Sequence, residues 1–219
     1  MRRRRFFHRT PNPSPLMRIL LFPFLSAFLL AAPTNGANIV YSGIQNLPIP
    51  LNSEGTYLQI DSGATAATFP PDWATAPWLN PFFGGVYIGN SPLLRPVIVG
   101  TDQILRVEPG TVIGSESNFA SGESGSTTHV GGGPGQFALN VPGYLGFTFR
   151  PEAGGSDYYG WLLIEIDNTG PGKIISWAYD NTPDTPIVTG APIVPEPGVL
   201  GLLALAGAGA GLGLRRRRG

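Results

Sequence analysis

Glycine and proline interrupt the central part of this chain at short intervals, and that pattern restricts the structures it can form. The 219 residues include 31 glycines and 23 prolines. Between them lie short runs of β-branched and aromatic residues, whereas helical periodicity is almost absent over residues 38–189. Such runs, separated by turn residues about every 8–12 positions, are typical of antiparallel sheets. The sequence therefore predicts an all-β domain over 38–189, an antiparallel β-sandwich or jelly roll.

Two segments give the clearest alternation of apolar and other residues. In Tyr144–Arg150 the residues Leu145, Phe147 and Phe149 alternate with smaller or polar ones, and Tyr159–Asp167 is apolar on both faces. The turn Asn168–Gly172 predicts a hairpin-like loop after the second segment. Further strands are expected at Asn38–Ile44, Thr56–Asp61, Ala66–Phe69, Gly85–Ile88, Val97–Val99, Ile104–Val107, Phe137–Asn140, Ile174–Tyr179 and Pro186–Val188.

The front of the chain has the layout of a secretory signal peptide. Met17 and Arg18 precede the apolar run Ile19–Ala32, which is followed by small residues, and cleavage is expected between Thr34 and Asn38. Residues 1–37 are thus expected to form the signal peptide region, with Met1 or Met17 as its start. The arginines at positions 3–5 leave the twin-arginine route open as an alternative.

The other end of the chain is built like a membrane-targeted tail. Residues 190–198 form a proline-rich spacer, and residues 199–214 contain no ionisable group. As a transmembrane helix that span would be roughly 24 Å long, short against a hydrocarbon core of about 30 Å. Arginines in the final segment, 215–219, would stop transfer and stay in the cytoplasm. They are Arg215, Arg216, Arg217 and Arg218.

The order of features in this tail resembles the PEP-CTERM sorting signal of exopolysaccharide-producing Gram-negative bacteria. The box Val194, Pro195, Glu196 and Pro197 precedes the apolar span and the arginine cluster. The resemblance implies that an exosortase, a membrane cysteine protease-transpeptidase, is a partner that cuts near the box. The chain would be exported across the inner membrane, held there transiently by its C-terminal helix, and then moved to the cell envelope, the surface or the extracellular matrix. The alternative is a plain C-terminal anchor.

A second resemblance covers residues 143–191. The stretches GYLGFTF, YYGWLLIEID, GKIISWAYDNT and IVTGA are similar to an ectodomain type that recurs in PEP-CTERM proteins, with a YGW strand and a WAYD-like strand. The resemblance implies an all-β fold. It transfers no catalytic residues.

Charge and cysteine content exclude several classes of function. Residues 38–195 contain four basic and 13 acidic side chains, a formal charge of about −9, which argues against a nucleic-acid partner. The chain has no cysteine, so disulfides, thiolate nucleophiles and cysteine metal sites are excluded. No cofactor is expected.

Four tryptophans are candidates for stacking on sugar rings. Trp73 and Trp78 lie in a proline-rich segment and are expected to be exposed, so they are the candidates for exopolysaccharide binding. Trp161 and Trp177 lie in predicted strands and are expected in the core.

Other polar residues give weaker indications of chemistry. His129 lies among Ser, Thr and Gly, and a solvated loop histidine is expected there. Carboxylates at the ends of the last two long strands are weak calcium candidates, with turn formation as the other explanation: Asp167, Asp180 and Asp184. Three hypotheses follow: an exported, non-enzymatic protein of unknown activity, a carbohydrate-binding module, and a secreted glycoside-acting enzyme.

Overall fold

The computed structural model describes residues 38–101, 103–121 and 127–190. The signal peptide region, the Pro-Glu-Pro box, the span 199–214 and the arginines at 215–218 lie outside the described residues. All described residues belong to the same compact unit of the chain. Within these ranges, no helix has the length and apolar character needed to cross a bilayer.

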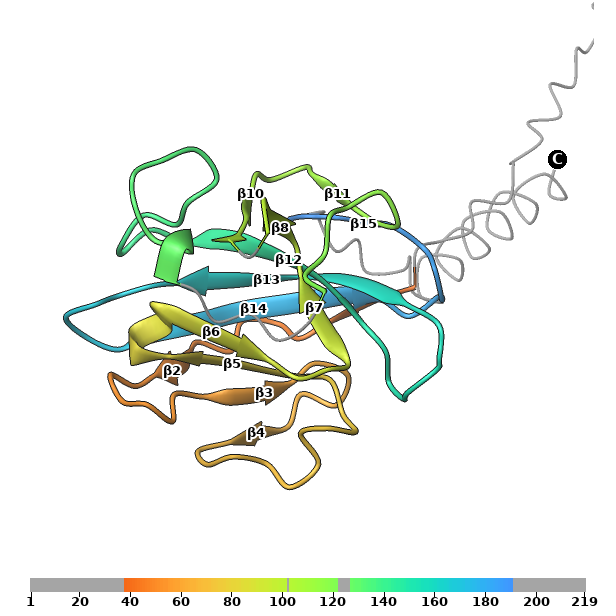
Figure 1. Ribbon diagram of the computed structural model, residues 1–219, viewed down its shortest axis with the longest axis horizontal. Coiled ribbons are helices and arrows are strands. Elements are labelled where there is room, and N and C mark those ends of the chain that lie inside the picture. Colours follow the sequence, from red (N-terminus) through yellow and green to blue (C-terminus); the bar gives the residue numbers. More distant parts are fainter. Residues whose placement is uncertain (1–37, 102, 122–126, 191–219) are drawn as a thin grey trace, which may run out of the picture. The chain divides into compact units, whose positions relative to one another are not determined.

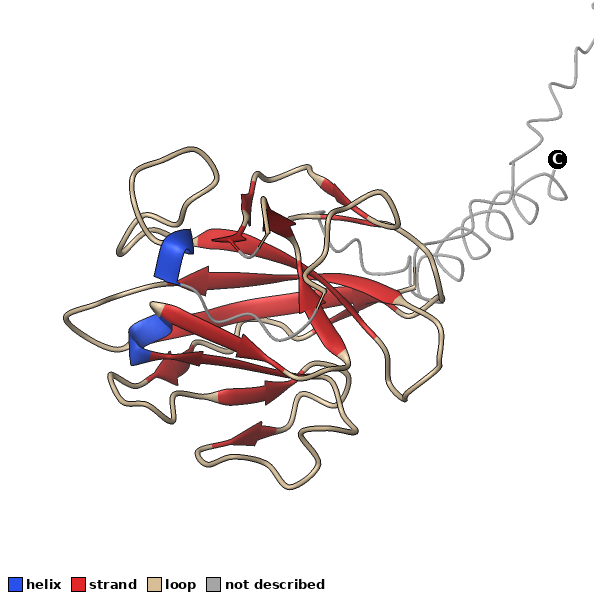
Figure 2. Cartoon of the chain, viewed as in Figure 1, coloured by secondary structure: helices blue, strands red, loops and turns tan. Residues whose placement is uncertain are grey.

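Strands and loops make up the described part of the chain, which confirms the predicted all-β class (Figure 2). The helical elements within it are two single 3₁₀ turns, η1 (Phe83–Gly85) and η2 (Thr127–His129). The strands are β1 (Ile39–Tyr41), β2 (Leu47–Ile49), β3 (Tyr57–Gln59), β4 (Thr65–Ala66), β5 (Trp78–Phe82), β6 (Tyr87–Asn90), β7 (Leu94–Pro96), β8 (Ile98–Val99), β9 (Gln103–Ile104), β10 (Arg106–Val107), β11 (Val112–Ile113), β12 (Gly143–Phe149), β13 (Tyr158–Glu165), β14 (Gly172–Asp180) and β15 (Ile187–Val188).

The three longest strands, β12, β13 and β14, form an antiparallel meander at the centre of a seven-stranded sheet (Figure 1). The order is β1-β14-β13-β12-β10, with β2 also beside β14 and β7 also beside β12. Gly160 lies opposite Phe147 in this meander, and a Cβ atom at Gly160 would come within 2.3 Å of the Phe147 ring. The glycine in the YGW motif therefore gives the phenylalanine ring its space.

Both faces of the central sheet are buried, because its strands alternate between two apolar clusters. On one face, Phe147 and Leu162 pack with Leu58, Leu79 and other residues of the four-stranded sheet β4-β3-β5-β6. On the other face, the central strands pack against the two-stranded sheet β11-β15 and neighbouring residues. Members of this second cluster include Trp161, Ala178, Ile113 and Ile187.

The sequence predicted the long strands more accurately than the short ones. It missed four strands, namely β2, β5, β7 and β11. Pro81 made β5 hard to predict, since proline is disfavoured inside a strand. The β3 pairing reaches only Trp78 and Leu79, and beyond it Pro81 takes part on that side through its carbonyl oxygen, which accepts the Thr56 amide at 3.0 Å. The predicted strand Phe137–Asn140 is wrong: it reduces to a single bridge between Phe137 and Val130.

The loop between β13 and β14 runs from 166 to 171, close to the predicted turn. Asp167 organises it by accepting three hydrogen bonds on its Oδ1 atom. The donors are the Thr169 amide at 2.8 Å, the Thr169 hydroxyl at 2.9 Å and the Gly170 amide at 3.0 Å. These bonds, that of the Thr169 amide first, hold the pKa of Asp167 below its ordinary value.

Candidate functional site

A wide bulge in the edge strand of the central sheet creates the most distinctive local geometry of the described chain. β1 and β2 both pair with β14, but the five residues between them, 42–46, oppose only three residues of β14, 175–177. Gly43 and Asn46 accommodate the extra length with φ angles of 71° and 50°. Bulges turn side chains away from the regular pleat and are common beside binding sites.

The bulge is fixed to β14 through hydrogen bonds with Trp177. The Ser42 amide donates to the Trp177 carbonyl at 3.0 Å, and the Trp177 amide donates to Ser42 Oγ at 2.9 Å. The Gln45 side-chain amide donates to the Ser42 carbonyl oxygen. Ser42 and Gln45 are thereby held beside the indole of Trp177.

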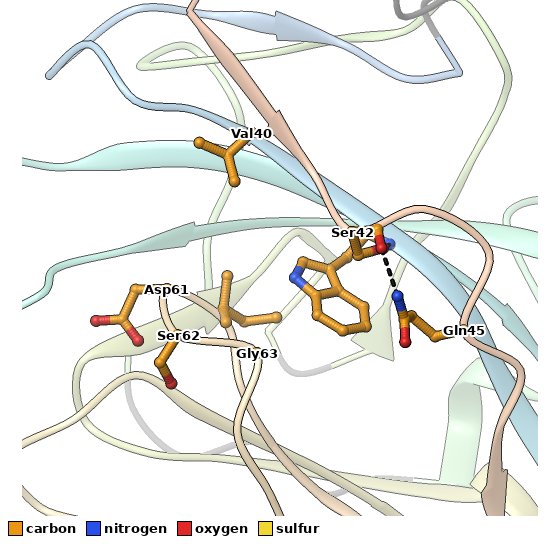
Figure 3. A pocket seen from close by; sticks show the side chains of 8 residues that line it. Val40, Ser42, Gln45, Asp61, Ser62 and Gly63 are labelled. Carbon is orange, nitrogen blue, oxygen red and sulfur yellow. Dashed lines mark hydrogen bonds between the residues drawn. The ribbon is translucent and has the colours of Figure 1, made fainter.

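A pocket of about 250 Å³ opens at this bulge. Figure 3 shows Ser42 and Gln45 on one side of it and Asp61 and Ser62 on the other. Val40, Ile60, Gly63 and Trp177 complete the lining. We name it the bulge pocket. It combines apolar walls with a few polar groups, which is the usual character of a small-ligand site.

Asp61 is the only ionisable residue among those that line the bulge pocket. Its Oδ1 atom is shielded from solvent and has no hydrogen-bond partner among the described residues. Because solvent does not reach Oδ1, a ligand hydroxyl or amine in the pocket would have to bind Asp61 through its other carboxylate oxygen.

Tyr179 holds the backbone of Asp61 in place. Its hydroxyl donates to the Asp61 carbonyl oxygen at 3.2 Å. Burial, together with the negative charge of Asp61, raises the pKa of Tyr179, so the phenol stays a protonated donor over the whole neutral range. The position of Asp61 therefore depends on packing against β14.

Charge around the bulge pocket restricts its ligand to a neutral or cationic one. The lining holds no Lys or Arg. Each of the four basic side chains in the described residues is already in an ion pair: Arg95 and Arg150 with Asp157, Arg106 with Glu108, and Lys173 with Glu165. An anionic ligand would meet the Asp61 carboxylate without a cation to offset it.

The two tryptophans predicted to be exposed lie elsewhere. Trp78 is only 5 % exposed, and its indole donates to Asp72 Oδ1 at 3.1 Å. The expected exposure of Trp78 is therefore wrong, because it begins β5 and packs with Tyr57 in a buried cluster. Trp73 is half-buried against Tyr57 and against Phe69, which is 61 % exposed. Phe69 ends the predicted strand Ala66–Phe69, and the sequence did not indicate its contact with Trp73.

Trp161 and Trp177 are buried, as expected, with exposed fractions of 4 % and 6 %. Trp177 nevertheless lines the bulge pocket, where its small exposed area gives an apolar wall and not a broad stacking surface. The sequence placed Trp177 in the WAYD-like strand but gave no sign of the pocket, since the partners of Trp177 come from 40–45 and 60–63.

The structure does not bring the calcium candidates together. Asp167 lies in the turn before β14 and Asp180 at the far end of that nine-residue strand. Asp184 lies in the next loop, with a φ angle of 56°. Among the described residues, no group of three or more His, Asp or Glu side chains is placed to hold a metal ion.

The predicted solvation of His129 is wrong. The side chain is completely buried, with its Nε2 atom 3.2 Å from the Gly85 carbonyl oxygen and its ring edge-on to Phe137. The surrounding Ser, Thr and Gly suggested a solvated loop, but the 3₁₀ turn Thr127–His129 directs the imidazole inward. His129 is a core residue and is not part of the bulge pocket.

Comparisons of the chain with protein-family models, with curated proteins and with solved structures find no match. The assignment of function consequently depends on the residues and the geometry of the described domain.

Proposed function

We propose that this chain is an exported protein that an exosortase sorts to the cell envelope or extracellular matrix, and that its β domain, a β-sandwich of jelly-roll type, binds a neutral carbohydrate. The sorting part of the proposal is supported by the sequence. A segment with the layout of a signal peptide precedes the domain, and the Pro-Glu-Pro box, apolar span and arginine cluster follow it in the order of a PEP-CTERM tail.

The carbohydrate part is supported by one observation, the composition of the bulge pocket. Hydroxyl, amide and carboxylate groups face an apolar wall, and no cation lies in the lining. Sugars present hydroxyl donors that Asp61 can accept and apolar ring faces that Val40 and Trp177 can contact.

Binding is favoured over cleavage at this pocket. Glycoside hydrolysis uses a pair of carboxyl groups on either side of the bond. The bulge pocket is lined by a single carboxylate, that of Asp61. The proposed domain therefore holds its glycan without changing it.

The test is binding of the full-length chain, in mild detergent, to a panel of neutral and anionic polysaccharides. We expect neutral glycans to bind, and Asp61→Ala to weaken binding roughly tenfold or more because the carboxylate hydrogen bond is lost. Glu116→Gln, which changes an exposed carboxylate outside the pocket, should bind like wild type. Binding of anionic glycans alone, or equal binding by Asp61→Ala, would overturn the assignment.

A further inference from the structure

We infer that the ligand is a linear, extended neutral saccharide. It lies along the edge segment of the domain and occupies a second hollow in addition to the bulge pocket. This inference depends on the proposed carbohydrate binding and adds the shape and length of the ligand to it.

A second hollow, of about 450 Å³, lies further along the same edge. Its lining includes Leu47, Pro48 and Pro50 from the edge segment and Thr56, Thr65 and Ala67 from the β3–β4 side. We name it the proline hollow. Since it contains no ionisable side chain, it offers apolar and hydroxyl contacts only.

The bulge pocket and the proline hollow share the same two walls. One wall is the edge segment 40–50, and the other is the β3–β4 hairpin with its flanking residues, 55–67. Figure 1 shows β2, β3 and β4 following one another at this side of the molecule. We name the line between these walls the edge seam.

The spacing of the two hollows fits a chain molecule. Ser42 of the bulge pocket is hydrogen-bonded to Trp177, and Pro48 of the proline hollow lies opposite Lys173 in the strand register. These positions are four residues apart on β14, roughly 13 Å at about 3.3 Å per residue. A single sugar ring cannot contact both places, whereas an extended oligosaccharide can.

The backbone at the edge seam disfavours the other extended polymer, a polypeptide added as a strand. Pro48 lies in the middle of β2 and has no amide hydrogen to donate. Its carbonyl oxygen already accepts the Thr56 hydroxyl at 2.6 Å. Strand addition depends on such main-chain hydrogen bonds, so the edge seam suits a ligand that uses side-chain contacts.

The test measures affinity against ligand length. The full-length chain in mild detergent is titrated with neutral glucan, mannan and galactan oligosaccharides, from the monosaccharide to the hexasaccharide. We expect affinity to rise with length by roughly tenfold or more, because contact with the second hollow becomes intramolecular, and then to level off.

A filling substitution separates the two hollows. Ala67→Phe places a ring in the proline hollow from an exposed loop position and should remove the gain from length while leaving the monosaccharide affinity unchanged. Ala153→Phe, at an exposed position in a different loop, is the matched control and should keep the full length dependence.

The outcomes distinguish this inference from the proposed function. Equal affinity at all lengths, or an equal loss at all lengths in Ala67→Phe, would overturn the extended ligand and leave carbohydrate binding standing. No binding of any neutral saccharide would remove both. Binding of neutral extended peptides that Ala67→Phe abolishes would assign the edge seam to polypeptide instead.

Discussion

At the scale of single residues, the domain buries polar side chains that the sequence pattern places in a solvated loop or at a strand end. His129 and Asp180 are both completely buried. Asp180 accepts the Thr182 amide on Oδ1 at 2.8 Å, whereas its Oδ2 atom has no partner among the described residues. Neither burial could be predicted, since each depends on residues distant in the sequence, Gly85 for His129 and the partner strand β1 for Asp180.

The first stability prediction concerns His129. His129→Ala should lower the free energy of unfolding by about 2–3 kcal/mol, because it leaves a cavity beside Phe137 and removes the partner of the Gly85 carbonyl. Denaturant unfolding followed by tryptophan fluorescence measures the change. Ser121→Ala, at an exposed position in the same loop region, should stay within about 0.5 kcal/mol of wild type. An equally small effect of His129→Ala would show that the imidazole is not packed in the core.

At the scale of elements, the alternation of apolar with other residues predicted the long strands that are buried on both faces and paired with other strands on both sides. Tyr144–Arg150 and Tyr159–Asp167 match β12 and β13 within one or two residues. The missed strands have five residues or fewer, and proline occurs in three of them, at Pro48, Pro81 and Pro96. Their pairing is set by neighbours from distant parts of the chain, which a local pattern does not contain.

The candidate site was less predictable than the strands. Nothing in the residues around Asp61 marks it, because its proximity to Trp177 and Tyr179 joins positions more than a hundred residues apart. The bulge at 42–46 is equally hidden, since its two extra residues become apparent only when β1 and β2 are aligned against the same strand.

The turn between β13 and β14 gives a prediction on pH. The pKa of Asp167 is lowered in the folded state, so its carboxylate stabilises the fold above its ordinary value of 3.8. That stabilisation is lost as the pH falls through the lowered folded-state value. We therefore expect wild type to be more stable than Asp167→Asn at neutral pH, and the difference to shrink in acid.

Denaturant unfolding of both proteins at about pH 7 and about pH 3 checks the Asp167 prediction. Thr169→Val removes one of the three donors, the hydroxyl, and should reproduce part of the effect. A difference between wild type and Asp167→Asn that is constant or grows in acid would contradict the proposed hydrogen-bonded carboxylate.

At the scale of the whole molecule, the prediction concerns processing of the tail. Proline fixes the backbone on both sides of Glu196 and leaves that residue as the one charge of the box. Glu196→Ala should leave membrane insertion intact, because the apolar span and the terminal arginines are unchanged, but it should trap the unprocessed, membrane-bound form.

The measurement is the ratio of tailed to untailed protein in membrane and external fractions of a host that has an exosortase. Lys173→Gln, a change within the β domain, serves as the control and should be processed like wild type. Equal processing of Glu196→Ala and wild type would show that Glu196 is not recognised, and processing of neither would leave a plain anchor as the better description of the tail.

The excess of acidic over basic side chains in the described domain limits how closely copies of it can approach one another. With every described cation already matched by a carboxylate, the remaining acids give the domain the behaviour of a small polyelectrolyte. Copies held close together repel one another in dilute salt, and mobile counterions shorten that repulsion to about 8 Å at an ionic strength of about 0.15 M. Ionic strength thus controls how densely such domains can crowd together.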